Sequence, residues 1–220
     1  MSLLFPDRVI DTILLDMDGT VLSSIKSAER VWAAWAERQG LDVAAFLPTI
    51  HGVQSVETIR RLNLPGLDPV AEAAAITAAE IEDVEGIEPI AGVAAFLAAL
   101  PPERWAIVTS APRLLASARL AAVGIPLPHL MIAAEDVQRG KPAPDCFLLA
   151  AEKLGTSTDN CLVLEDSPAG IAAAEAAGAA VLVVTATHTH PVDTPHPTIA
   201  DYAALDVDVS ADGAIRLACA

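Results

Sequence analysis

VIDTILLDMDGT, residues 9–20, is an apolar run that ends in two aspartates two positions apart. The run from Val9 to Leu15 predicts a strand that is buried on both faces, as in a parallel sheet covered by helices. Ligands of such sheets bind at the carboxyl ends of the strands. If the chain stays extended, Asp16 and Asp18 point to one side, and the pair suits a nucleophile with a general acid/base. The alternative interpretation is a polar loop with two solvated carboxylates.

Further short apolar runs alternate with helical patterns along the rest of the chain. This alternation predicts a doubly wound, Rossmann-like α/β core with a parallel sheet. The last two helices stop near glycines, as helices commonly do. The expected strands are Trp105–Val108, Cys161–Leu164 and Ala180–Val184, and the expected helices are Gly92–Leu100, Arg113–Val123, Pro144–Leu154 and Ala169–Ala177.

The segment between the first two strands is far longer than one crossover helix requires, and its pattern is helical. Ser27–Gln39 places Val31, Trp32 and Trp35 on one side of a helix, and Asp68-Pro69 is typical of a helix start. We therefore expect a small α-helical cap domain at residues 21–89, inserted into a core domain of residues 1–20 and 90–220. Near the C-terminus, Asp212-Gly213 between two apolar runs predicts a hairpin at a sheet edge.

Composition excludes several classes of protein. Hydrophobic residues make up 53% of the 220 residues and charged residues 19%, which excludes intrinsic disorder. The longest apolar stretches are about half the length of the roughly 20 residues that a membrane-spanning helix needs. The net charge is −16 and no basic patch is visible, so neither nucleic acid nor a membrane is an expected partner. The first residues lack a signal-peptide pattern, and the 3 cysteines lack metal-ligand spacing, so a cytoplasmic location is expected.

Three later segments carry polar groups at positions where strands end. Thr109 and Ser110 follow the second strand, where a hydroxyl and free amides can hold a phosphate oxygen. Lys141 stands between a glycine and a proline and could neutralise a transferring phosphoryl group. Glu165 and Asp166 end the third strand and, with Asp16, would form an oxygen-rich site for Mg²⁺. Each segment alone is also compatible with a helix cap or a solvated charge.

Taken in order, these four segments resemble the four motifs of the haloacid-dehalogenase (HAD) superfamily. The match rests on Asp16-x-Asp18-Gly19-Thr20, Thr109, Lys141 and Glu165-Asp166, and it covers nearly the whole chain. The helical insert after the first motif resembles the C1-type cap of this superfamily. One departure is Ala91-Gly92, where Pro-Gly is common.

Longer stretches resemble one branch, which contains glycerol phosphate, 2-deoxyglucose-6-phosphate and broad sugar phosphatases. These stretches are HGV (51–53), WAIVTS (105–110), DVQRGKP (136–142) and EDSPAGI (165–171). The His-Gly pair of the cap discriminates best, because the last stretch is shared with β-phosphoglucomutases. The resemblance implies a Mg²⁺-dependent phosphatase that acts on a small phosphorylated sugar or polyol through an aspartyl-phosphate.

The resemblance also assigns roles to individual residues. Asp16 would be the nucleophile and Asp18 the general acid/base. Mg²⁺ would bind the Asp16 carboxylate, the Asp18 carbonyl and Asp166, with Glu165 bound directly or through water. The phosphate oxygens would be held by Lys141, Thr109 and the amides of Met17 and Ser110. His51 and Gly52 of the cap, with Arg113, are the candidates for substrate contact.

Two other functions remain open at this point. A β-phosphoglucomutase-like enzyme would pass the phosphoryl group to a second sugar oxygen. A phosphatase and such a mutase differ in how slowly water hydrolyses the aspartyl-phosphate, and the sequence does not report that rate. A non-catalytic sugar-phosphate-binding module would be expected to lack a catalytic carboxylate, and none is missing here. A dehalogenase is disfavoured because that branch lacks the aspartate two residues after the nucleophile. We expect a monomer or a weak homo-oligomer, since cap and core must hinge.

Overall fold

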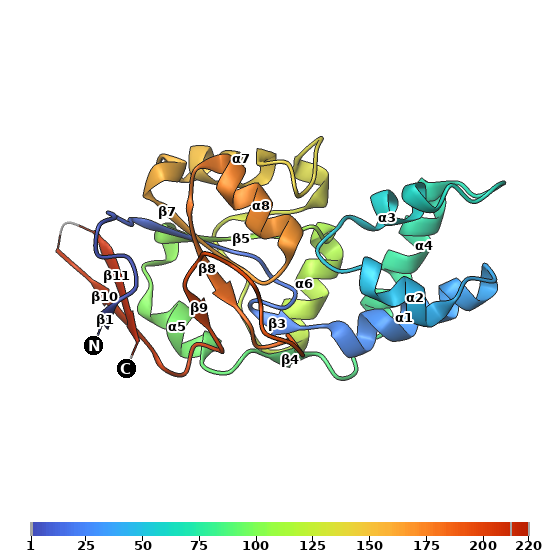
Figure 1. The fold of residues 1–220 in the computed structure, drawn as a ribbon, viewed down its shortest axis with the longest axis horizontal. Coiled ribbons are helices and arrows are strands. Elements are labelled where there is room, and N and C mark those ends of the chain that lie inside the picture. Colours follow the sequence, from blue (N-terminus) through green and yellow to red (C-terminus); the bar gives the residue numbers. More distant parts are fainter. Residues whose placement is uncertain (1, 212, 220) are drawn as a thin grey trace.

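A six-stranded parallel sheet forms the centre of the computed structural model, which describes residues 2–211 and 213–219 (Figure 1). Every neighbouring pair in the sheet is parallel. The strand order is β6-β5-β2-β7-β8-β9, so the chain runs outward from β2 in both directions. This order confirms the predicted α/β fold. The strands are β2 (Thr12–Leu15), β5 (Trp105–Val108), β6 (Met131–Ile132), β7 (Cys161–Glu165), β8 (Ala180–Val184) and β9 (Thr198–Ile199).

Helices cover both faces of this sheet (Figure 1). Side chains alternate along the central strand: Ile13 and Leu15 pack with α5 and α6, whereas Leu14 packs with α7 and α8. Because both faces of β2 are covered, its four residues are all buried. Three of them are apolar, and the Thr12 hydroxyl donates to the Asp11 carboxylate. The helices are α5 (Val93–Ala99), α6 (Arg113–Ala122), α7 (Asp145–Leu154) and α8 (Pro168–Ala177), with single 3₁₀ turns at Pro102–Arg104, Ala134–Asp136 and Thr158–Asn160.

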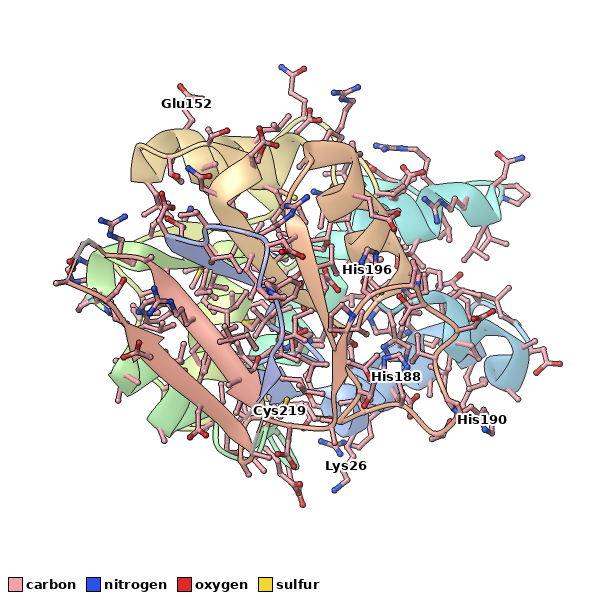
Figure 2. All side chains as sticks on the ribbon, turned by 60° about the vertical axis from the view of Figure 1, so that its left-hand side comes forward. Lys26, Glu152, His188, His190, His196 and Cys219 are labelled. Atoms are coloured by element: carbon pink, nitrogen blue, oxygen red, sulfur yellow. The ribbon has the colours of Figure 1, made fainter. Side chains whose placement is uncertain are left out.

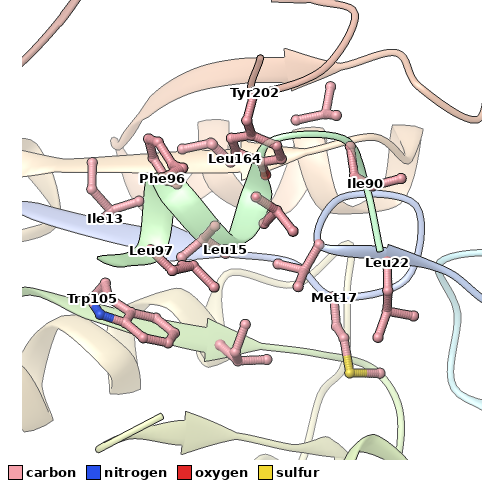
Figure 3. Close-up of a cluster of buried hydrophobic side chains, with 14 of the residues drawn as sticks. Ile13, Leu15, Met17, Leu22, Ile90, Phe96, Leu97, Trp105, Leu164 and Tyr202 are labelled. Carbon is pink, nitrogen blue, oxygen red and sulfur yellow. The ribbon is translucent and has the colours of Figure 1, made fainter. Parts of the chain in front are cut away.

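The core on the α5 side also anchors the loop that follows β2 (Figure 3). The rings of Phe96 and Tyr202 lie 4.8 Å apart, and the Tyr202 hydroxyl donates to the backbone oxygen of Thr20 at 3.1 Å. Met17 and Leu22 fill the same core below that loop. The loop that carries both aspartates is therefore held by packing on one side and by a buried hydrogen bond on the other.

Four helices form an insertion between the short strands β3 and β4, and we call residues 24–87 the helical insertion. It has its own apolar cluster, in which Trp32, Trp35 and Phe46 pack with 5.7 Å between ring centroids. Its two ends meet where β3 pairs antiparallel with β4. Whether residues 21–89 behave as a separate domain stays a prediction. The elements are β3 (Leu22–Ser23), α1 (Ile25–Arg38), α2 (Val43–Phe46), the 3₁₀ turn Leu47–Thr49, α3 (Ser55–Leu62), α4 (Pro69–Glu82) and β4 (Glu88–Pro89).

Helix boundaries in the insertion follow local sequence signals. Asp68 caps α4 as predicted, because its carboxylate accepts from the amides of Val70 and Ala71. Pro69 occupies the first helical position, where no intrahelical hydrogen bond is lost. The helix predicted over residues 27–39 is observed as α1, shifted toward the N-terminus.

One of two local expectations is wrong, namely the start of the first buried strand. The predicted C-terminal hairpin is confirmed: β10 and β11 pair antiparallel, and β11 also pairs with β1 in a separate three-stranded sheet, while the edge of the parallel sheet is taken by β9. Its strands are β1 (Ser2–Leu3), β10 (Leu205–Val209) and β11 (Ile215–Cys219), and Asp212 of its expected turn lies outside the described residues. Val9 is exposed, because the first buried strand begins only at Thr12.

Two further findings concern membranes and cysteines. Within residues 2–211 and 213–219, we find no helix with the length and apolarity needed to cross a bilayer. The three cysteines are free, and Cys146 and Cys161 are buried. Buried thiols of this kind pack as small apolar groups, as expected.

We predict that Leu14→Ala lowers the free energy of unfolding by about 2–5 kcal/mol, because it leaves a cavity in the middle of the sheet. Urea denaturation measures the change. Leu127→Ala is the matched control: Leu127 is exposed, so the same truncation should change stability by less than about 0.5 kcal/mol. Equal effects of the two substitutions would contradict the assignment of β2 as the central strand.

Candidate active site

Polar side chains converge at the carboxyl end of the central strands. Asp16 directly follows β2, Thr109 directly follows β5 and Glu165 is the last residue of β7. Lys141 comes from the loop between β6 and α7. Because β5, β2 and β7 are neighbours and parallel, their ends meet at one edge of the sheet. The four predicted segments are thus brought together by topology.

Lys141 is buried at the centre of this convergence. Its ammonium donates to Asp16 Oδ1 at 2.5 Å, to Glu165 Oε1 at 2.7 Å and to the backbone oxygen of Val108 at 3.0 Å. An ammonium group has three donors, so all of them are used. The Phe147 ring lies 5.2 Å from the same nitrogen. Lys141 therefore has one fixed position, between the first and the last of the four segments.

Glu165 is fully buried, and the protein engages both of its carboxylate oxygens. Oε1 accepts from Lys141, and Oε2 accepts from the amides of Asp166 and Ser167 at 2.8 Å each and from the Ser167 hydroxyl at 3.1 Å. Gly170 leaves the necessary space, since a Cβ there would lie 1.5 Å from Oε1. These contacts fix both Lys141 and the turn that carries Asp166.

The acidic residues could hold a divalent cation. One ligand oxygen from each of Asp16, Glu165 and Asp166 lies within 4.8 Å of the others. Carboxylate oxygens are the donors that Mg²⁺ prefers. Gly19 approaches Asp166 so closely that a Cβ would fall 1.9 Å from Oδ2. The absence of a side chain at Gly19 thus allows Asp166 to take its place in the cluster, and the donor set fits a small, hard cation.

Burial changes the pKa values of the charged side chains in this site. Burial raises the pKa of Asp16 to about 8 although Lys141 opposes this shift, and burial together with Glu165 and Asp16 raises the pKa of Asp166. Burial alone would lower the pKa of Lys141, but the carboxylates of Asp16 and Glu165 hold it above its ordinary value. Lys141 pairs with Asp16 and Glu165 but not with Asp166, so a bound cation would stabilise the ionised forms of Asp16 and Asp166.

A cavity of about 530 Å³ opens next to this cluster and has the size of a small-ligand site. Asp16, Asp18, Thr109 and Ser110 line it on the core side. The Thr109 hydroxyl accepts from the Ala111 amide at 3.0 Å, in the turn that leads into α6. The predicted hydroxyl groups therefore face the same space as the two aspartates.

The helical insertion closes the opposite side of the cavity. His51 and Gly52 both line it, as the sequence led us to expect. Gly52 has a φ of +73°, and a Cβ there would lie 2.7 Å from Ser167. The Ser110 hydroxyl donates to the Gly52 backbone oxygen at 3.3 Å. The insertion thus contacts the core directly above the site, and only glycine allows so close an approach.

Two other candidate residues are placed away from the cavity. The Arg113 guanidinium donates to Asp136 at 2.5 Å and to the Met131 backbone oxygen at 3.2 Å, and Arg113 is absent from the described cavity lining. Its expected substrate contact is thus not supported by its position. The Met17 side chain is buried in the core, so the role predicted for its amide stays a prediction.

Sequence reasoning missed several residues of the cavity wall. Ser24, Glu80 and Arg119 line it, and Arg119 forms ion pairs with both Asp18 and Glu80. Burial raises the pKa of Glu80, and Arg119 opposes that shift. His188, on the loop between β8 and β9, donates from Nε2 to the Asp166 backbone oxygen at 2.9 Å (Figure 2). None of these residues belongs to a recognisable motif, so spacing along the chain could not identify them.

A family model for haloacid dehalogenase-like hydrolases matches residues 10–178, which include Asp16, Asp18, Thr109, Lys141, Glu165 and Asp166. This chain is a haloacid dehalogenase-like hydrolase. Hexitol phosphatase A of Escherichia coli is 40% identical over 186 residues, which cover 83% of this chain and 84% of that protein. Glycerol-1-phosphate phosphohydrolase 2 of Saccharomyces cerevisiae is 30% identical, with 81% and 76% covered. These similarities confirm the resemblance to the polyol and sugar phosphatase branch.

The fold is also similar to that of solved structures. The crystal structure of CbbY from Rhodobacter sphaeroides in complex with phosphate superposes with a TM-score of 0.75 at 23% identity, covering 88% of this chain and 95% of that one. At this level of identity, the likeness concerns the architecture, including the helical insertion after the first strand of the parallel sheet.

We predict that Mg²⁺ binding to the purified protein releases protons and becomes tighter as the pH rises. The reason is that Asp16 and Asp166 hold their protons to higher pH than ordinary aspartates, and the cation displaces those protons. Isothermal titration calorimetry in two buffers of different ionisation enthalpy measures the number released. Release should be larger at about pH 6 than at about pH 9.5.

Asp166→Asn supplies the matched variant for this measurement. It removes one titrating ligand and keeps the shape of the side chain, so both the affinity and the number of released protons should fall. Binding without proton release at either pH would contradict the electrostatic description of the site.

Proposed function

We propose that this protein is a Mg²⁺-dependent phosphatase that hydrolyses a small phosphorylated sugar or polyol through a covalent aspartyl-phosphate. The observation that carries this proposal is the buried junction in which Lys141 bridges Asp16 and Glu165 beside a cavity that Asp18 also lines. That junction combines a carboxylate nucleophile, a second carboxylate for proton transfer and a fixed positive charge. Phosphoryl transfer requires little else, since positioning and charge neutralisation supply most of its catalysis.

In the first step, Asp16 attacks phosphorus in line with the leaving alcohol. A bond forms between a carboxylate oxygen and phosphorus, while the bond between phosphorus and the sugar or polyol oxygen breaks. Asp18 donates its proton to that departing oxygen. Lys141 lies 2.5 Å from Asp16 Oδ1, where it orients the nucleophile and offsets the charge that arrives with the phosphate.

In the second step, a water molecule hydrolyses the aspartyl-phosphate. Asp18 is now a carboxylate and accepts a proton from that water, whose oxygen attacks phosphorus. The bond between phosphorus and Asp16 breaks, so inorganic phosphate leaves and both aspartates return to their starting states. Thr109 and the Ser110 amide would hold the remaining phosphate oxygens during both steps.

Asp16, Asp166 and the Asp18 backbone carbonyl are the groups that we expect to hold the cation. When bound, Mg²⁺ supplies charge shielding between the anionic nucleophile and the anionic phosphate and orients the phosphoryl group. Glu165 already accepts hydrogen bonds at both oxygens. We therefore assign it to holding Lys141 and Asp166 in place, with contact to the cation through water.

The relatives and the size of the cavity support this substrate class. Hexitol phosphatase A and glycerol-1-phosphate phosphohydrolase 2 are named for phosphorylated polyols. A cavity of about 530 Å³ accommodates one small sugar or polyol in addition to its phosphate. His51 of the helical insertion lines the cavity and could hydrogen-bond a substrate hydroxyl. The core would bind the phosphate, and the insertion would select the carbon skeleton.

Phosphate release from a panel of substrates tests this function. The panel contains hexitol phosphates, glycerol 1- and 3-phosphate, 2-deoxyglucose 6-phosphate, hexose 6-phosphates, β-glucose 1-phosphate and a nucleotide, each with Mg²⁺ and with EDTA. We expect Mg²⁺-dependent release that is fastest with one polyol or sugar phosphate. Positional transfer of phosphate without release would contradict the assignment and indicate a mutase.

Asp16→Asn is the control for this assay. The amide has nearly the same shape but is a poor nucleophile, so release should fall by at least about 100-fold while the melting temperature remains close to that of the wild type. Retention of more than about a tenth of the activity would exclude Asp16 as the nucleophile.

A further inference from the structure

Arg119 is a buried cation that the proposed chemistry does not use. It lies on α6, with 5% of its surface exposed, and lines the active-site cavity on the side of the helical insertion. A buried charge is costly unless it is paired, so the partners of this side chain explain its position.

The two partners of Arg119 come from different parts of the fold. Its Nη1 lies 2.9 Å from Asp18 Oδ2, in the core loop after β2, and its Nη2 lies 3.0 Å from Glu80 Oε1, on α4 of the helical insertion. A guanidinium is a rigid planar fork, so fixing one nitrogen fixes the direction of the other. Glu80 therefore helps to determine where Arg119 meets Asp18.

The second oxygen of Asp18 is also held. The Ser24 hydroxyl, directly before α1, donates to Asp18 Oδ1 at 2.6 Å. With Arg119 at Oδ2, both oxygens are engaged from different directions, and rotation of the carboxylate would break a contact. A general acid/base acts only within hydrogen-bond reach of the atom that exchanges the proton. These two contacts thus determine whether Asp18 reaches that atom.

Arg119 leaves one of its donors unused while it pairs with the two carboxylates. Within the described part of the chain, Nε is buried and has no hydrogen-bond partner. An unsatisfied buried donor costs about 1–3 kcal/mol. An arginine placed only to stabilise the interface between insertion and core would be expected to use this donor as well.

We propose that Arg119 is a positioning residue, held by Glu80 of the helical insertion, that orients the Asp18 carboxylate for proton transfer to the leaving oxygen. This inference rests on the proposed phosphatase function. It adds a physical link between the insertion and the chemistry. Four side chains form the network around Asp18, and two of them, Ser24 and Glu80, belong to the insertion. Docking of the insertion onto the core then also orients the Asp18 carboxylate.

The leaving group of the substrate distinguishes this role from a structural one. A sugar or polyol alkoxide must be protonated as it departs, whereas p-nitrophenolate departs without a proton. The parameter kcat/KM reports the steps up to departure of the leaving group, so it isolates the acid role of Asp18 from its later role as a base. A defect in Asp18 orientation should therefore lower kcat/KM for the polyol phosphate far more than for p-nitrophenyl phosphate.

The test compares Arg119→Gln with Arg60→Gln, in which an exposed arginine of the insertion is changed in the same way. For Arg119→Gln we expect kcat/KM to fall by about 100-fold with the best polyol phosphate and by less than about threefold with p-nitrophenyl phosphate. Glu80→Gln should shift the ratio of the two values in the same direction by about tenfold. Arg60→Gln should leave both values unchanged.

Other results would overturn the inference. If Arg119→Gln and Glu80→Gln lower kcat/KM equally for both substrates, the arginine serves stability or phosphate binding, and the phosphatase function stands. If either variant is unstable, the other still decides the question, because thermal melting identifies the folded one. A folded wild-type protein that hydrolyses neither substrate would overturn the phosphatase function and, with it, this role of Arg119.

Discussion

The buried ammonium of Lys141 is the contact on which the rest of the site depends. It joins Asp16 after β2, Glu165 at the end of β7 and the Val108 carbonyl at the end of β5. Breaking a buried ion pair typically costs about 3–5 kcal/mol, because one charge is left uncompensated. Lys141 thereby connects the ends of three strands, and its positive charge partly neutralises the acidic residues of the site. Fold stability and phosphoryl chemistry therefore share one interaction, and Gly170 is required because no side chain could fit beside Glu165.

The active-site cavity is lined by the core and by the helical insertion together. Gly52 packs against Ser167, the Gln54 side chain donates to the Ala134 backbone oxygen at 3.1 Å, and Glu80 reaches Arg119. The contacts of Gly52 and Glu80 lie at the cavity, so the insertion supplies its distal wall and would limit the access of bulk water to a bound phosphate. A phosphatase gains from this arrangement, because electrostatic interactions with the phosphate strengthen once bulk water is removed.

The sequence predicted the sheet, the insertion and the convergence of the acidic and lysine residues, because continuous apolar runs and strand-end residues are local signals. It did not predict Arg119, Glu80 or Ser24, since their meeting depends on how α4 docks against α6 and on no spacing along the chain. Arg113 was expected at the substrate because it follows Thr109 and Ser110 closely, but Asp136 draws its guanidinium away. The hairpin was recognised from Asp-Gly, yet its pairing with β1 required a contact between the two ends of the chain.

The most direct test of the central claim is to detect the phosphoryl group on Asp16. Asp18→Asn would be mixed with p-nitrophenyl phosphate and Mg²⁺, quenched in acid and analysed by peptide mass spectrometry. The good leaving group allows the first step, and the missing general base delays hydrolysis, so the intermediate should accumulate. The account predicts one added phosphoryl group on the peptide that contains Asp16, and on Asp16 itself. Release of p-nitrophenol without a labelled peptide, or a label on another residue, would contradict it.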